Sequence, residues 1–300
     1  MVCAGGLGTR VAGWSRYIPK EFYPVGGRPG IVHLLDEIAW SGPADVVIVC
    51  HPYYEAFTSW ARTALSQHGR DRYAQEARLR PAPGQQGGLT ASFITQHGPY
   101  ADLTPVLNGV DHLAASGDLY VAFADNLYPD ASPLTALRHV ARGYPAVLTR
   151  AYQRELAGTR GVIAVARYHG ELLVLEMAEK PGPAAATELE RRYGTSALRL
   201  LEGRARLTAE FISFACGYRA PHRTEPRLAF ALAAYARDHP VGVITTTSRV
   251  IDLGSGPACG CAAARATTGN TVMEGASCSS DSSQSTRPRR RSGPLTRRST

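Results

Sequence analysis

The sequence predicts an α/β fold in which a mostly parallel, mixed central sheet lies between two layers of helices. Segments with the pattern of buried strands alternate along the chain with segments of helical periodicity, which is typical of a parallel sheet covered on both faces. A glycine-rich turn follows the first strand-like segment. The chain has 300 residues, 44% of them hydrophobic, and is therefore long enough to bury such a core.

The expected elements follow one another in a regular order. Ligands in open α/β sheets bind beyond the carboxyl ends of the strands, so polar residues at those ends are the candidates for chemistry. The first predicted strand is shorter than the usual strand length of about five residues. Strands are predicted at 1–4, 45–50, 119–124, 146–150, 161–167, 172–177 and 241–245, and helices at 31–40, 54–67, 133–142, 188–193 and 227–238.

The end of the chain differs in composition from the rest. The formal net charge is +8, and residues 271–300 hold six arginines against two acidic residues, which accounts for +4 of it. Ser, Thr, Arg and Pro dominate there without hydrophobic periodicity, so this segment cannot bury enough apolar surface to order itself. We expect a folded domain over residues 1–268 and a disordered tail over 269–300. An arginine-rich tail could bind nucleic acid, but a solvated tail is the simpler interpretation and no nucleic-acid partner is expected.

Membrane and zinc-binding classes find no support in the sequence. No apolar run approaches the roughly 18 residues of a membrane-spanning helix. The N-terminus lacks a basic patch followed by an apolar run and a cleavage site, so no signal peptide is expected. The six cysteines show no second pair at zinc-ligand spacing. We therefore expect a cytoplasmic protein without a membrane partner.

The strongest local signal is the segment Cys3-Ala-Gly-Gly-Leu-Gly-Thr-Arg10. Its three glycines permit tight turns and let backbone N–H groups approach an anion closely. Arg10 adds a permanent charge with forked donors suited to phosphate. The segment is not a Walker loop, because no Gly-Lys-Ser/Thr closes it. By itself it is also compatible with a dinucleotide-binding turn or a simple tight loop.

Three further segments carry residues suited to phosphate and metal chemistry. Lys20, in Ile18-Pro-Lys-Glu-Phe-Tyr-Pro-Val25, can meet a second phosphate on a loop stiffened by two prolines. Asp125 ends the apolar strand of Tyr120-Val-Ala-Phe-Ala-Asp-Asn-Leu127, where a metal carboxylate or a turn cap is expected. A Glu-Lys pair ends another strand in Glu176-Met-Ala-Glu-Lys-Pro181.

Gly-Gly-x-Gly-Thr-Arg followed by Pro-Lys-Glu-x-x-Pro-Val resembles the sugar-phosphate nucleotidyltransferases, and most closely the bacterial UTP–glucose-1-phosphate uridylyltransferases. The segments Gln96 to Asn108, Arg160 to Val165 and Arg249 to Gly256 resemble later motifs of that family, in the family's order. The resemblance covers roughly residues 1–268. It implies a Rossmann-like, three-layer nucleotide-diphospho-sugar transferase fold.

The resemblance also implies a role for each matching residue. Gln96 would read the nucleobase edge from the loop 96–108, and Gly161 would let the backbone approach the sugar. The carried-over roles are catalytic for Arg10, Lys20 and Lys180; nucleotide-binding for Ala4, Gly5, Gly6, Gly8, Thr9 and Gln96; sugar-binding for Gly161, Glu179 and Lys180; and Mg²⁺-binding for Asp125 and Asp252.

The expected reaction is Mg²⁺-dependent transfer of a uridylyl group from UTP to a sugar 1-phosphate, with glucose 1-phosphate as the expected sugar. Two alternatives stay open at this point. One is a thymidylyltransferase, because the sequence does not resolve the space around the methyl group that separates thymine from uracil. The other is a non-catalytic relative that binds nucleotide sugars. Assembly into a homo-oligomer is also left open.

Overall fold

The computed structural model describes residues 1–42, 44–66, 89–114, 117–129, 131–140, 143–220 and 225–254. All of them belong to one unit, Met1–Thr267. The predicted tail, residues 269–300, lies outside the described residues, so the tail and the domain boundary stay predictions. No helix in the described part of the chain is long and apolar enough to cross a membrane.

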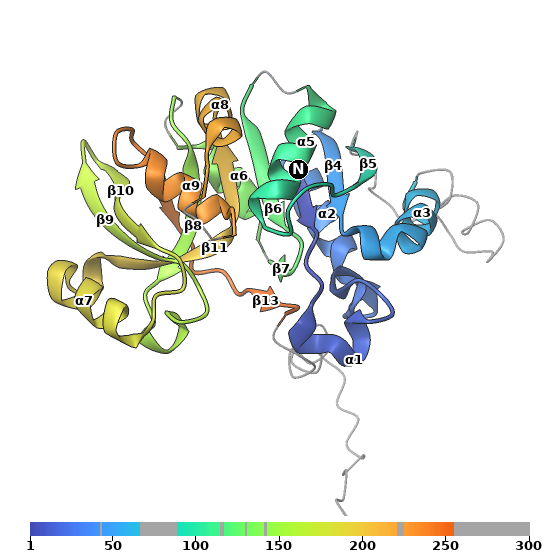
Figure 1. Ribbon diagram of the computed structural model, residues 1–300, viewed down its shortest axis with the longest axis horizontal. Coiled ribbons are helices and arrows are strands. Elements are labelled where there is room, and N and C mark those ends of the chain that lie inside the picture. Colours follow the sequence, from blue (N-terminus) through green and yellow to red (C-terminus); the bar gives the residue numbers. More distant parts are fainter. Residues whose placement is uncertain are drawn as a thin grey trace, which may run out of the picture. The chain divides into compact units, whose positions relative to one another are not determined.

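A mixed sheet runs through this unit, with the strand order β5-β4-β1-β6-β11-β8-β12-β10-β9 (Figure 1). Its first four strands are parallel to one another. The short first strand therefore has a neighbour on each side, and its residues pair with β4 and β6. These strands are β1 (Val2–Ala4), β4 (Ala44–Cys50), β5 (Leu89–Thr95) and β6 (Leu119–Phe123).

The other strands form the mixed part of the sheet. β11 is antiparallel to β6, β8 and β9, while β12 is parallel to β8. β10 is antiparallel to both β9 and β12. β11 therefore joins the parallel half of the sheet to the rest. These strands are β8 (Ala146–Ala151), β9 (Val162–Tyr168), β10 (Glu171–Ala178), β11 (Leu198–Leu207) and β12 (Gly242–Thr245).

Helices cover both faces of the sheet, as the alternating pattern predicts. One layer holds α5, α8 and α9, which contact one another in sequence, with α5 on β4 and α9 on β10. The other layer holds α2 and α6, which contact each other, with α6 on β8 and β11. The helices are α1 (Ala12–Ser15), α2 (Gly30–Trp40), α3 (Glu55–Ala64), α5 (Leu103–Leu113), α6 (Pro133–Arg138), α7 (Pro183–Tyr193), α8 (Ala209–Gly217) and α9 (Leu228–Tyr235).

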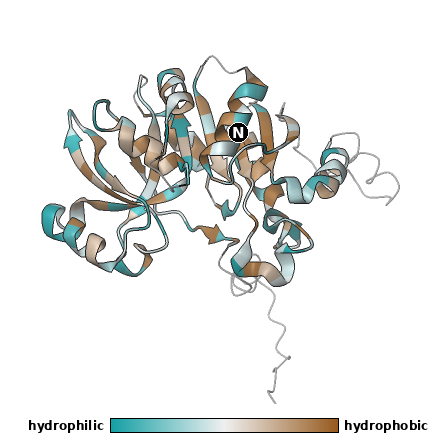
Figure 2. Cartoon of the chain, viewed as in Figure 1, coloured by the Kyte–Doolittle hydropathy of each residue, from teal (hydrophilic) through white to brown (hydrophobic). Residues whose placement is uncertain are grey.

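The alternation of side chains along each strand divides the core into two parts. Val2 and Ala4 pack with the α2 and α6 side, and Cys3 packs with the α5, α8 and α9 side. Since successive strand residues face opposite sides, β1 must be apolar at every position to be buried between the layers. Figure 2 shows this hydrophobic character in the central strands, in contrast to the more polar α7.

The structure differs from the elements predicted from the sequence in several places. The segment 96–108, expected to be a loop, becomes helix α5 from Leu103 onward. The helices expected at 54–67 and 133–142 are shorter, and end at Ala64 and Arg138 (residues 67, 141 and 142 lie outside the described part). Strand β11 was not expected, because its sequence carries several charged residues.

The charges on β11 are tolerated because other elements supply their partners. The Arg204 guanidinium donates to both carboxylate oxygens of Glu37 on α2, with Nε–Oε1 at 3.0 Å and Nη2–Oε2 at 2.7 Å. Both side chains are buried. Arg206 donates to backbone carbonyls of Leu137, Val140 and Tyr144. A buried strand with charges is thus stable only in this tertiary context.

Candidate active site

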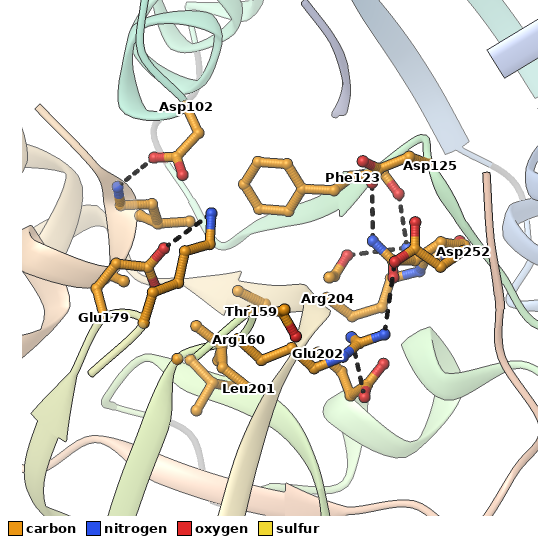
Figure 3. A pocket seen from close by; sticks show the side chains of 18 of the residues that line it. Asp102, Phe123, Asp125, Thr159, Arg160, Glu179, Leu201, Glu202, Arg204 and Asp252 are labelled. Atoms are coloured by element: carbon orange, nitrogen blue, oxygen red, sulfur yellow. Dashed lines mark hydrogen bonds and ion pairs between the residues drawn. The ribbon is translucent and has the colours of Figure 1, made fainter. Parts of the chain in front are cut away.

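A cavity of about 470 Å³ opens beside the carboxyl end of β6 and the antiparallel strands β9 to β11 (Figure 3). The residues around it come from segments spread between positions 10 and 252. Six of the residues singled out from the sequence line it, namely Arg10, Asp125, Gly161, Glu179, Lys180 and Asp252. The other seven do not line it, namely Ala4, Gly5, Gly6, Gly8, Thr9, Lys20 and Gln96.

The glycine-rich loop lies against Lys20 and Gln96. A Cβ atom on Gly5 would stand 2.2 Å from Oε1 of Gln96, and one on Gly6 would stand 3.1 Å from Cε of Lys20. Gly8 adopts a left-handed φ of 61°, which favours glycine over other residues. The loop therefore needs its glycines because the side chains of Lys20 and Gln96 pack directly against its backbone.

Lys20 is the buried partner of Asp125. Its ammonium lies 2.7 Å from Oδ2 of Asp125 and 3.1 Å from Oε1 of Glu21. Burial by itself would lower the pKa of Lys20, but the two carboxylates raise it. Burial would raise the pKa of Asp125, but the Lys20 ammonium and its hydrogen bond hold it below the ordinary value. Both groups are therefore charged at neutral pH. A carboxylate that binds a metal has to be ionised, and Asp125 meets this requirement.

Two short strands bring Asp125 and Asp252 together. β7 (Asn126–Leu127) pairs antiparallel with β13 (Ile251–Asp252), so Asp252 stands opposite the residue that follows Asp125. The Leu253 N–H donates to the Asp125 carbonyl at 2.8 Å, and the Gly254 N–H donates to Oδ1 of Asp252 at 2.8 Å. Two acids 127 positions apart in sequence thus reach one edge of the cavity.

The carboxylates present here suit a Mg²⁺ ion whose other ligands are waters and substrate phosphates, and they do not form a site made of protein ligands alone. The described residues contain no group of three or more His, Cys, Asp or Glu side chains that could hold a metal. Mg²⁺ is commonly bound by one or two carboxylates, with waters and substrate phosphates as its other ligands. Asp125 and Asp252 supply that number of carboxylates. Arg10 lies beside Asp252, since a Cβ atom on Gly254 would be 2.9 Å from Nη2 of Arg10 and 3.0 Å from Oδ1 of Asp252.

Arg160 and Glu202 line the cavity between the edge that carries Asp125 and Asp252 and the end that carries Glu179. Neither side chain was singled out from the sequence. Arg160 contacts Oε1 of Glu202 at 3.3 Å and Oδ2 of Asp252 at 3.8 Å. Glu202 is fully buried on β11 and also accepts a hydrogen bond from the Tyr128 hydroxyl at 2.8 Å. Burial and the neighbouring Glu202 carboxylate raise the pKa of Tyr128, so it remains a donor. The network holds Arg160 in place beside Asp252.

The residues predicted to bind the sugar meet at the opposite end. Glu179 accepts a hydrogen bond from Arg227 at 3.0 Å and lies 3.5 Å from the Lys180 ammonium. A Cβ atom on Gly161 would be 3.1 Å from Oε2 of Glu179, which explains the need for glycine there. Lys180 has a left-handed φ of 48°, and about half of its side chain is exposed. Arg227 is a contributor that the sequence did not indicate.

These features define the class of the protein as a Rossmann-like α/β protein with a glycine-rich loop and two carboxylates at strand ends. The family model for nucleotidyl transferases matches residues 1–202. The chain belongs to the nucleotidyl transferase family, and the resemblance seen in its motifs is thereby confirmed.

Solved structures share the fold over most of their length. The chain covers 96% of a UDP-glucose pyrophosphorylase complexed with UDP-glucose, using 88% of its own residues, with a TM-score of 0.69 and 20% identity. It covers 90% of a UDP-glucose pyrophosphorylase from Acinetobacter baumannii, again with 88% of its own length, at a TM-score of 0.64 and 22% identity. A candidate glucose-1-phosphate thymidylyltransferase from Bacillus anthracis is covered to 96% by 91% of the chain, with a TM-score of 0.65 and 15% identity.

Curated relatives match shorter stretches. The bifunctional enzyme IspD/IspF of Sinorhizobium medicae (strain WSM419) is 31% identical over 130 residues, which is 43% of this chain and 26% of that enzyme. A candidate UTP–glucose-1-phosphate uridylyltransferase of Bacillus subtilis (strain 168) is 33% identical over 66 residues, 22% of this chain and 24% of that protein. The chain thus spans about a quarter of the length of these relatives.

Proposed function

We propose that this protein transfers a uridylyl group from UTP to a sugar 1-phosphate, giving a UDP-sugar and pyrophosphate, with Mg²⁺ as cofactor and glucose 1-phosphate as the substrate to test first. Membership of the nucleotidyl transferase family supports the reaction class. The Pro19-Lys20-Glu21 segment supports the uridylyltransferase branch. Similarity to UDP-glucose pyrophosphorylases agrees with this choice at the level of the fold.

A single observation carries the proposal. The groups suited to phosphate and metal (Arg10, Asp125 and Asp252) and the groups suited to a sugar (Glu179 and Lys180) line one cavity of about 470 Å³. A reaction that joins a nucleotide to a sugar phosphate needs both sets within reach of one another. The first set alone would indicate only a nucleotide-binding protein, and the second set alone only a sugar-binding one.

In the proposed reaction, a phosphate oxygen of the sugar phosphate attacks the α-phosphorus of UTP. The new P–O bond forms as the bond to the leaving pyrophosphate breaks. The attacking phosphate is already ionised, so no general base is required, and catalysis consists of positioning and charge neutralisation. Mg²⁺ held by Asp125 and Asp252 would screen the negative charge of the phosphates.

The chain's own residues divide the remaining work. Arg10 stands beside Asp252 and would neutralise the triphosphate and the departing pyrophosphate. Lys20 keeps Asp125 ionised and oriented through their 2.7 Å contact. Lys180 is half exposed beside Glu179 and would meet the phosphate of the attacking substrate. Glu179 would accept hydrogen bonds from sugar hydroxyls.

Pyrophosphate release by the purified full-length protein tests the proposal. Reactions contain Mg²⁺ and either UTP or dTTP, each with and without glucose 1-phosphate. Release that requires both substrates and prefers UTP is the expected result. Preference for dTTP would replace the proposal with the thymidylyltransferase alternative, which the fold-level similarity to a candidate thymidylyltransferase keeps in view. A folded protein that binds nucleotide sugars without any release would instead be the non-catalytic relative.

A further inference from the structure

Asp102 precedes helix α5, but its carboxylate does not cap that helix. Oδ1 of Asp102 instead accepts a hydrogen bond at 2.7 Å from the N–H of Leu228, the first residue of α9. In Figure 3 the other carboxylate oxygen is directed toward the space between Phe123 and Glu179. Asp102 lines the same cavity as the proposed reaction centre. Within the described part of the chain, no donor is found for this second oxygen.

Two adjacent residues fix Asp102 and Glu179 at the same end of the cavity. The Arg227 side chain binds Glu179 at 3.0 Å, and the backbone N–H of the next residue, Leu228, binds Asp102. A hydrogen bond of 3.2 Å from the Leu103 N–H to the Pro226 carbonyl fastens the same two segments together. Asp102 is therefore as firmly placed at the sugar end as Glu179.

The electrostatic surroundings of Asp102 are mixed. Burial raises the pKa of Asp102 to about 6, and Glu179 raises it further, while the Leu228 N–H, Arg227 and Lys180 lower it. The buried thiol of Cys3 on β1 also interacts with Asp102. The carboxylate is ionised at neutral pH, and its second oxygen faces the cavity, where it can accept a hydrogen bond from a bound ligand.

We propose that Asp102 is a specificity-determining residue that accepts a hydrogen bond from a ring hydroxyl of the sugar 1-phosphate. The inference rests on the proposed function, because it assigns a residue to the sugar end of that same site. One oxygen of Asp102 holds α9 in position and the other binds substrate. A site with a buried acceptor for a hydroxyl rejects the analogue that lacks the hydroxyl, since the acceptor is then left unpaired.

The variant Asp102→Asn separates the two duties. Its side-chain carbonyl can still accept the Leu228 N–H, while the negative charge and one acceptor are lost. We expect the KM for glucose 1-phosphate to rise about 10- to 100-fold, as for loss of a charged hydrogen bond, and the KM for UTP to stay within about 2-fold. Asp111→Asn, an exposed position on the same helix, is the matched control and should change neither KM.

A series of deoxy sugars identifies the partner hydroxyl. Glucose 1-phosphate lacking its hydroxyl at position 2, 3, 4 or 6 is compared in the wild type and in Asp102→Asn. One analogue should be a poor substrate for the wild type and lose nothing more in the variant, because the contact is already absent. If every analogue suffers the same additional loss in the variant, Asp102 serves only to hold α9.

The pH dependence supplies a readout that a purely structural role would not move. As the pH falls through about 6, protonation of Asp102 should raise the KM for glucose 1-phosphate more in the wild type than in Asp102→Asn. The substrate phosphate itself titrates near pH 6, so the difference between the two proteins is the quantity to measure. Identical profiles would overturn the inference. A wild type that uridylylates no sugar 1-phosphate would overturn the proposed function together with it.

Discussion

The two halves of the central sheet differ in how their site residues are brought together. On the parallel half, β5-β4-β1-β6, the glycine loop and Lys20 both follow the first strand within the first 20 residues of the chain. At the other end of the cavity, Glu179 and Arg227 from the mixed half meet Asp102, which follows β5 of the parallel half, so three separated segments come together there. The residues proposed to bind the phosphates are thus found largely in one stretch of sequence, whereas tertiary contacts build the end that is proposed to choose the sugar.

The buried pair of Glu37 and Arg204 connects the two halves. Glu37 belongs to α2, which packs near the glycine-loop side, and Arg204 belongs to β11. Arg204 also donates to the carbonyls of Phe123 and Asn126, on either side of Asp125. The edge of the cavity that carries Asp125 is thus held from the mixed half as well as from the parallel half.

The largest effect is expected from Asp125→Asn. Loss of this carboxylate should lower kcat/KM by about 10²–10³-fold or more, the size seen when one preorganised electrostatic group is removed. The variant should remain folded by circular dichroism, because Lys20 keeps Glu21 as a partner. Asp36→Asn, which breaks a partly exposed pair with Arg28, is the matched control and should keep its activity. An active Asp125→Asn enzyme would remove this residue from the site.

Glu37→Ala tests the connection between the halves. It leaves the Arg204 guanidinium buried without its carboxylate, which should lower the free energy of unfolding by about 3–5 kcal/mol. Urea denaturation monitored by fluorescence measures the change. Glu188→Ala removes a carboxylate from an exposed pair on α7 and should leave the midpoint nearly unchanged. Equal midpoints for the two variants would mean that the pair does not join the halves energetically.

Gly5→Ala tests the parallel half by itself. The new methyl group would meet Oε1 of Gln96 at 2.2 Å, so the loop or the glutamine has to move. We expect the KM for UTP to rise about 10-fold, since small misplacements of a binding group are costly, and the KM for the sugar phosphate to stay constant. Gly13→Ala, where a Cβ atom meets nothing within 4 Å, is the control. A rise confined to the sugar-phosphate KM would contradict the division between the two halves.

The smallest effect concerns the pH dependence of stability at Asp102. Its folded-state pKa of about 6 lies above the ordinary 3.8, so between these values the folded state binds more protons than the unfolded state. Stability from this group is therefore present at low pH and is lost as pH rises toward 6. Asp102→Asn should be more stable than the wild type at pH 7 by roughly 1–2 kcal/mol, with a smaller difference at pH 5.

Urea unfolding of both proteins across this pH range gives the comparison. If Asp102→Asn is more stable than the wild type and has a higher KM for the sugar phosphate, Asp102 is a residue retained for binding. A variant less stable than the wild type at every pH would show that the carboxylate is needed mainly to hold α9.

The sequence by itself determined the three-layer fold, the family and the order of the motifs. Period-two and helical patterns depend only on which side chains are buried, and a motif such as Gly5 to Arg10 is short enough to be recognised in a single segment. Hence strands such as β4 and β6, the covering helices α2, α6 and α9, and six residues of the cavity wall could be found before the structure, whereas α5 and α8 could not.

Only the tertiary structure decided which residues complete the cavity. β11 was missed because its charges, such as Glu202 and Arg204, look incompatible with burial until Tyr128 and Glu37 are placed beside them. Asp102 and Arg227 had no distinguishing pattern, because a carboxylate or guanidinium in a polar segment is ordinarily solvated. Their significance comes from contacts between segments 126 residues apart for Asp102 and Leu228 and 48 residues apart for Arg227 and Glu179, and no local property of the chain encodes such contacts.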